Sequence, residues 1–81
     1  MHWDVVTVMP LANFCIDVTL RDGSHGVFDM KPYLDVGIFQ ELRDPAYFNR
    51  VDVQFDAVTW PHGQDIAPET LHAHLKTTES V

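Results

Sequence analysis

The stretch that decides the fold is residues 14–29, which read FCIDVTLRDGSHGVFD. Apolar and polar side chains alternate from Phe14 to Leu20, and this period of two is typical of a strand with one buried face. Asp22 and Gly23 follow directly. An Asp-Gly pair favours a hairpin turn because glycine adopts a positive φ without steric cost. A second short run returns over residues 25–29, so the stretch predicts a β-hairpin with which the other elements pair and pack.

The turn leaves two registers open for this hairpin. A two-residue loop places Val18 opposite Val27, whereas a three-residue loop with its glycine in a bulge places Ile16 opposite Phe28. Val27 and Phe28 are both apolar, so either register buries an apolar side chain, and the sequence does not choose between them.

Length and composition predict one small domain over residues 1–81, with 46% hydrophobic residues and a single cysteine, Cys15. One cysteine cannot form an internal disulfide, which fits a cytoplasmic protein. No stretch approaches the roughly 20 apolar residues that span a bilayer, so we expect no membrane association. The first residues also lack the basic start and apolar run of a signal peptide.

The formal charge is −7, from twelve acidic and five basic residues. An acidic surface repels phosphate and no basic stripe offsets it, so we expect no direct binding to nucleic acid. The charge favours solubility, and it also suits a basic protein partner.

Two further strand regions flank the central hairpin. Residues 3–9 are rich in β-branched residues, and the run is apolar on both faces, which suggests an inner strand ended by Pro10. Residues 50–55 alternate in polarity, and we expect a tight turn at residues 56–57 and a short returning strand at residues 58–60.

Helical signals are short and separated. We expect a single turn within residues 30–35, helical residues at 38–42, and a helical turn capped by Asp44 with Pro45 at its first position. Pro68 starts a last helix, and the polar residues 76–81 are expected to fray. The predicted fold class is α+β: a small, mostly antiparallel sheet of about five strands, with two or three short helices on one face.

Several polar residues invite a chemical interpretation. His62, Asp65, His72 and His74 lack the spacing of a metal site, so we expect no bound metal and no cofactor. Cys15 has no histidine near it in sequence and is expected to be an unreactive, partly exposed thiol.

Two other groups have a functional and a structural interpretation. Asp17 and Asp29 could be neighbours across the hairpin, but a solvated face is the commoner explanation. Trp60, His62 and Asp65 form the candidate functional loop. Its structural interpretation is that Trp60 is a buried strand end and that Asp65 caps the last helix.

Several segments in order resemble the bacterial family called domain of unknown function 2442: Leu20–Gly23, Gly26–Met30, Gly37–Leu42, Phe48 and Trp60–Leu71. The most specific part is the Trp-Pro-x-Gly-x-Asp run at residues 60–65, followed by Pro68 and Leu71. The resemblance implies a small, soluble α+β domain. It also implies a gene beside that of a second small protein, in pairs proposed to be toxin–antitoxin modules. It carries over no catalytic residues.

Two functional hypotheses follow. The first is a protein-interaction domain, the antitoxin-like member of a bacterial two-gene module, that binds a basic neighbour-encoded protein or forms a homodimer through its sheet or a sheet edge. The second is a small ligand-binding domain or enzyme that uses the loop around His62 and Asp65. We favour the first, because the sequence holds no nucleophile–base pair and no full set of metal ligands, and an enzyme is the less expected outcome.

Overall fold

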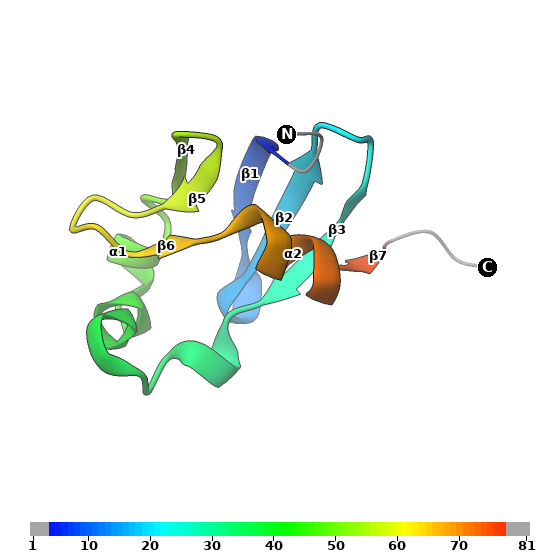
Figure 1. Cartoon of the computed structure of the whole chain (residues 1–81). Coiled ribbons are helices and arrows are strands. Elements are labelled where there is room, and N and C mark those ends of the chain that lie inside the picture. Colours follow the sequence, from blue (N-terminus) through cyan, green and yellow to red (C-terminus); the bar gives the residue numbers. More distant parts are fainter. Residues whose placement is uncertain (1–3, 78–81) are drawn as a thin grey trace.

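The computed structural model describes residues 4–77. The elements in chain order are β1 (Val5–Leu11), η1 (Ala12–Phe14), β2 (Cys15–Leu20), β3 (His25–Asp29), η2 (Lys31–Tyr33), η3 (Gly37–Arg43), α1 (Pro45–Phe48), β4 (Asp52–Gln54), β5 (Ala57–Thr59), β6 (Asp65–Ile66), α2 (Pro68–His74) and β7 (Lys76–Thr77). The α+β class and the antiparallel pairing are confirmed (Figure 1).

The central hairpin adopts the three-residue loop. Ile16 lies opposite Phe28, and the amide of Leu20 donates a hydrogen bond to the carbonyl of Ser24 at 2.8 Å. Gly23 has a φ of 93°, a conformation that glycine adopts without strain. The register with a two-residue loop is therefore not used.

The strands of this hairpin have one buried face. Ile16, Val18 and Leu20 of β2 are buried, and the residues between them are half-buried. Helix α2 crosses the sheet on one side (Figure 1), and its Leu71 belongs to the same hydrophobic cluster as the buried β2 residues. The side of the sheet that carries Cys15, Asp17 and Thr19 is the outer face.

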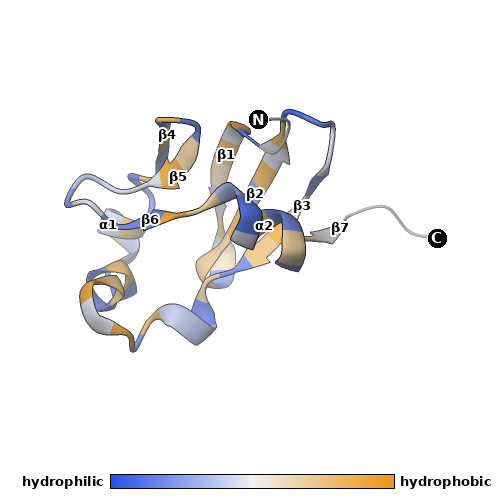
Figure 2. Cartoon of the chain, viewed as in Figure 1, coloured by the Kyte–Doolittle hydropathy of each residue, from blue (hydrophilic) through white to orange (hydrophobic). Residues whose placement is uncertain are grey.

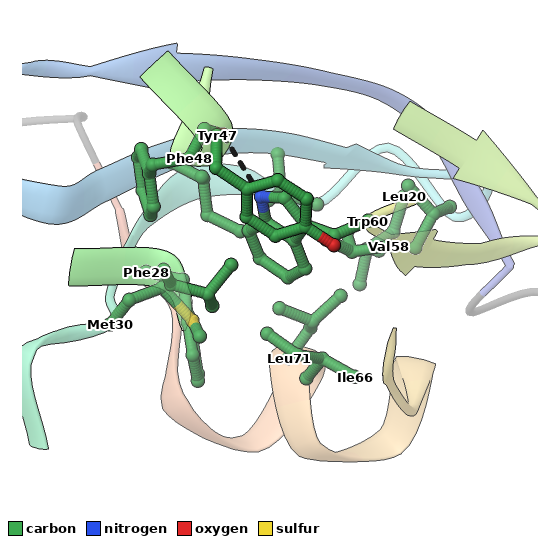
Figure 3. Close-up of a cluster of buried hydrophobic side chains, with 13 residues drawn as sticks. Leu20, Phe28, Met30, Tyr47, Phe48, Val58, Trp60, Ile66 and Leu71 are labelled. Atoms are coloured by element: carbon green, nitrogen blue, oxygen red, sulfur yellow. Dashed lines mark hydrogen bonds between the residues drawn. The ribbon is translucent and has the colours of Figure 1, made fainter. Parts of the chain in front are cut away.

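One hydrophobic cluster joins both sheets and the helices (Figure 3). Its buried members are Val5, Ile16, Val18, Leu20, Phe28, Met30, Leu42, Tyr47, Phe48, Val58, Trp60, Ile66 and Leu71. The indole N–H of Trp60 donates to the backbone carbonyl of Phe48 at 2.9 Å, the dashed line in Figure 3. The helical segments therefore pack on the side of the first sheet that carries the buried β2 residues.

The predicted single sheet of about five strands is wrong. The described strands form two sheets, ordered β1-β2-β3-β7 and β4-β5-β6. A backbone hydrogen bond of 2.9 Å runs from the amide of Val5 to the carbonyl of Asp56, where the β4–β5 hairpin meets β1. The β1–β2 register also shifts between Val5 and Thr7, and such a bulge bends a strand and interrupts regular pairing.

The expectation that Pro10 ends an inner first strand is also wrong. Pro10 lies within β1, opposite Ile16, and β1 is at the edge of its sheet. The amide of Leu20 points toward β3, and because backbone direction alternates along a strand, those of Val18 and Ile16 do too. Val8 and Pro10, which lie opposite Val18 and Ile16, therefore turn their backbone groups away from β2. A proline whose nitrogen faces outward removes no ladder hydrogen bond. The predicted start of this strand at Trp3 lies outside the described residues.

The predicted helical turns are present. η2, η3 and α1 fall at the expected positions, and the carboxylate of Asp44 accepts a hydrogen bond from the amide of Ala46 at 3.0 Å. This is the expected N-cap, with Pro45 in the first turn.

Three local predictions about the C-terminal half fail. The β4–β5 turn is made by Phe55 and Asp56, one residue earlier than predicted. Asp65 does not cap α2, because Ala67 is the N-cap residue and Asp65 belongs to β6. The predicted frayed tail is ordered over its first two residues, which form β7 and pair with Gly26 and Val27. The rest of that tail, residues 78–81, lies outside the described residues.

Candidate functional site

The candidate loop, residues 60–64, begins directly after β5. The amide of Trp60 donates to the carbonyl of Gln64 at 2.9 Å, and the amide of Gly63 donates to the carbonyl of Trp60 at 3.1 Å. Gly63 has a φ of 99°, so it supplies the turn conformation that its position in the motif predicts. The loop is thus closed by its own backbone.

Gln64 attaches the loop to the helical segments. Its side chain is 1% exposed. The amide nitrogen donates to the backbone carbonyl of Ile38 and to Oε1 of Glu41, each at 2.9 Å. The amide oxygen accepts a hydrogen bond from the hydroxyl of Tyr47 at 2.7 Å. A buried amide with these three partners holds its neighbours in one geometry, because losing any partner leaves a desolvated polar atom.

His62 closes the network from the other side. Its backbone amide donates to the hydroxyl oxygen of Tyr47 at 2.8 Å, and Nδ1 lies 2.6 Å from Oε2 of Glu41. The imidazole also lies against the Tyr47 ring, with centroids 5.1 Å apart. Glu41, Tyr47, His62 and Gln64 therefore form a closed polar network, which we call the loop network.

The pKa of Glu41 is lowered from its ordinary value. The main cause is the hydrogen bond from Gln64. The hydrogen bond and the charge of His62 act in the same direction, against a partial opposing effect of desolvation. Each donor favours the ionised carboxylate, so the network is formed with Glu41 as an anion.

The three candidate loop residues have different surroundings. Trp60 is 3% exposed and belongs to the core. The ring and amide of His62 take part in the loop network. Asp65 is exposed and lines a pocket of about 180 Å³ together with Tyr33, Phe39, Ile66, Ala67 and Thr70. A functional role for this loop stays a prediction.

His72 and His74 do not lie in an arrangement that resembles a set of metal ligands. Nε2 of His72 lies 3.6 Å from a carboxylate oxygen of Asp22, while His74 lines a separate surface pocket with Phe28 and Tyr33. Within residues 4–77 no three His, Cys, Asp or Glu side chains gather in a way that could hold a metal ion. Elemental analysis of untagged protein is the direct test of the metal prediction.

The two hairpin aspartates do not form a carboxylate pair. Cys15, and not Asp17, lies opposite Asp29. Asp17 pairs with His25 at 2.5 Å, and Asp29 pairs with Lys31 at 3.1 Å. Cys15 is half-buried, as expected. Each carboxylate has its own basic neighbour, which matches the solvated-face interpretation.

Sequence analysis missed the partners of the loop network and the exposed apolar residues. Tyr47 and Glu41 lie 17 and 23 residues before Gln64, so no local pattern links them. The side chain of Phe55 is 96% exposed and that of Met9 is 63% exposed. Figure 2 shows that hydrophobic colour reaches the β1 strand and the β4–β5 hairpin as well as the core elements. Alternation over residues 51–55 grouped Phe55 with the partly buried Val51 and Val53 and gave no signal of its exposure.

Comparison with known proteins identifies the family. The chain matches the model of the family described as "Protein of unknown function (DUF2442)" over residues 5–77, and it belongs to this family. No curated protein and no solved structure matched the chain. Across residues 4–77, none of the helices has the length and apolar content needed to cross a membrane.

Proposed function

We propose that this domain binds another protein through the tip of its β4–β5 hairpin and the outer face of β1. The observation that carries the proposal is Phe55, whose side chain is 96% exposed at the hairpin tip. Met9 and Leu11 are exposed on β1, on the same face as Asp17 and Cys15 of β2. These three exposed apolar side chains lie at the hairpin tip, which meets β1 at Val5, and farther along the same strand.

The hairpin tip lowers the stability of the isolated domain, because its backbone is strained and its aromatic side chain is exposed to water. Phe55 and Asp56 have φ values of 53° and 62°, in the left-handed region, which aspartate tolerates and a bulky residue such as phenylalanine avoids. Such a conformation costs on the order of 1 kcal/mol or more per residue, whereas Asn-Gly fits the same turn readily. An aromatic side chain kept in water on this turn gains nothing from folding. It gains apolar burial if a partner covers it, and aromatic residues are enriched at protein interfaces.

The edge of β1 is less suited to a partner than its face. The amide of Val5 is already bonded to Asp56, and Pro10 offers no N–H on the outward side. A strand added at this edge would find an incomplete ladder, and a proline on an edge strand is a known protection against such pairing. We therefore place the contact on side chains of the outer face and of the tip.

The partner is proposed to be basic and encoded by the neighbouring gene. The chain carries a formal charge of −7, which favours encounter with a positively charged protein and opposes a second copy of itself. The family resemblance adds the expectation of a two-gene module of the toxin–antitoxin kind. The same charge argues against contact with nucleic acid by the domain alone.

Coexpression with the product of the adjacent gene tests the proposal. We expect the two proteins to copurify and to elute together in gel filtration at moderate salt, and we expect the isolated chain to leave its own promoter DNA unshifted in a gel-shift assay. A homodimer of the isolated chain would favour the second copy as partner. A monomer that binds no protein, or one that shifts DNA specifically, would contradict the proposal.

A further inference from the structure

We infer that the pocket beside Asp65 receives a lysine or arginine side chain of the partner protein. The pocket, here called the Asp65 pocket, holds about 180 Å³ and lies between η2–η3 and β6–α2. This inference rests on the proposed function, because it names a second contact with the same protein partner, away from the hairpin tip and the outer face of β1.

Two aromatic rings line one side of the Asp65 pocket. The ring centroids of Tyr33 and Phe39 are 6.4 Å apart, and the ring planes are inclined by 60°. Tyr33 is also stacked on the buried Phe28, with centroids 5.7 Å apart and planes inclined by 21°. This stack ties the aromatic wall to β3. Aromatic faces attract ammonium and guanidinium groups within about 6 Å of the ring centroid.

Asp65 supplies the negative charge. In β6, Ile66 is buried and Asp65 is exposed, so the Asp65 side chain points away from the core on the wall of the pocket. Asp17, Asp29 and Asp35 each contact a basic side chain of this chain, His25, Lys31 and Arg43 respectively. The Asp65 carboxylate makes no such contact within residues 4–77, so its charge is available to an incoming cation.

Size and charge select a side chain as the occupant. A volume of about 180 Å³ corresponds to roughly six waters at about 30 Å³ each and is below the roughly 300–1,000 Å³ of ordinary small-molecule sites. It suits the head of one arginine or lysine with part of its methylene stem, which would pack on Ile66 and Ala67. The acidic chain as a whole favours a basic partner that carries such side chains.

Titration of the isolated, isotope-labelled full chain with side-chain probes tests this inference. The probes are N-acetyl-arginine methylamide and N-acetyl-lysine methylamide, with the neutral citrulline analogue as the uncharged control. We expect saturable NMR shifts at Tyr33, Phe39 and Thr70 with a charged probe and none with citrulline. No saturable shift at these residues with either charged probe would overturn the inference.

Matched variants locate the binding charge. Asp65→Asn should weaken binding of the arginine probe at least about fivefold, because Asp65 is the only acidic residue that lines the pocket within residues 4–77. Asp52→Asn, at an exposed position of β4, should change the affinity for the same probe less than about twofold. Equal affinity of wild type and Asp65→Asn would contradict the inference. Tetramethylammonium binding tenfold tighter than either side-chain probe would also contradict it, by favouring a free small cation. The titration needs no partner, so its failure is distinguishable from failure of the coexpression test.

Discussion

The two ends of strand β5 are built in opposite ways. At its start, the Phe55–Asp56 turn places an aromatic side chain in water on a left-handed backbone. At its end, the loop of residues 60–64 buries Trp60, uses Gly63 where φ is positive, and joins its polar groups into the loop network. One turn is satisfied within the fold, and the other exposes apolar surface at the cost of backbone strain.

The difference separates a region that the fold itself explains from one that we propose to be functional. The Trp-Pro-x-Gly-x-Asp run at residues 60–65 lies mostly at the satisfied end. The hydrogen bonds of its indole, its glutamine and its histidine account for these residues without any ligand. A binding surface is better sought where folding leaves an unfavourable exposure, and Phe55 is that place.

The largest expected effect on stability is that of Gln64→Ala. The change would leave the Tyr47 hydroxyl, the Ile38 carbonyl and Glu41 without a buried partner, so we expect the free energy of unfolding to fall by about 3 kcal/mol. Urea denaturation measures this. Gln54→Ala on exposed β4 is the matched control and should stay within about 0.5 kcal/mol of wild type. A loss below about 1 kcal/mol in Gln64→Ala would mean that the loop network is not structural.

Removal of one hydroxyl from the same network should have a smaller effect. Tyr47→Phe deletes a hydroxyl that donates to Gln64 and accepts from the amide of His62. We expect the free energy of unfolding, measured by urea denaturation, to fall by about 1.5 kcal/mol. Tyr33→Phe is the control, because its hydroxyl makes no hydrogen bond to the described residues. Equal stability of the two variants would argue against the assigned hydrogen bonds.

The strained turn should respond in the opposite direction. Replacement of Phe55 by Asn together with Asp56 by Gly gives the turn the residues that its backbone prefers. We expect the free energy of unfolding to rise by about 1 kcal/mol, measured as a higher urea midpoint at an unchanged slope. A destabilised double variant would show that Phe55 contributes to the fold and would weaken the contrast between the two ends of β5.

The smallest expected effect is a dependence on pH. The pKa of Glu41 is lowered in the folded state, so its contribution to stability is fully present above the ordinary glutamate pKa of about 4.3 and is lost as the pH falls through the lowered value. Glu41→Gln should therefore flatten the stability profile in acid. Glu69→Gln, on α2, serves as the comparison. Parallel acid profiles for wild type and Glu41→Gln would contradict the pKa assignment.

The pattern of neighbouring residues predicted where strands and helices form better than it predicted which other segments they contact. Alternation identified the hairpin of β2 and β3, and the Asp44-Pro45 pair identified α1, because both signals are read from adjacent residues. Pro10 was misjudged because its effect depends on whether its nitrogen faces a neighbouring strand, which the sequence does not record.

The candidate site was predicted in position only. Gly63 and the burial of Trp60 followed from local chemistry, whereas the partners of Gln64 are as far as 26 residues away in the chain. Phe55 is exposed because the β4–β5 turn begins one residue earlier than predicted, which places Phe55 in the turn and not in the strand. The partners of Gln64 and the exposure of Phe55 depend on tertiary structure, and a local periodicity in the sequence does not predict them.

The most direct test of the central claim measures how tightly the domain binds its partner when one exposed side chain is truncated. Two exposed positions are compared. Against the product of the adjacent gene, Phe55→Ala should weaken binding about 30-fold, which is roughly 2 kcal/mol, as expected for a buried aromatic anchor. Ile38→Ala, at another exposed apolar position on η3, should weaken binding less than about threefold. Equal affinities for wild type and Phe55→Ala, with both proteins folded, would contradict the account.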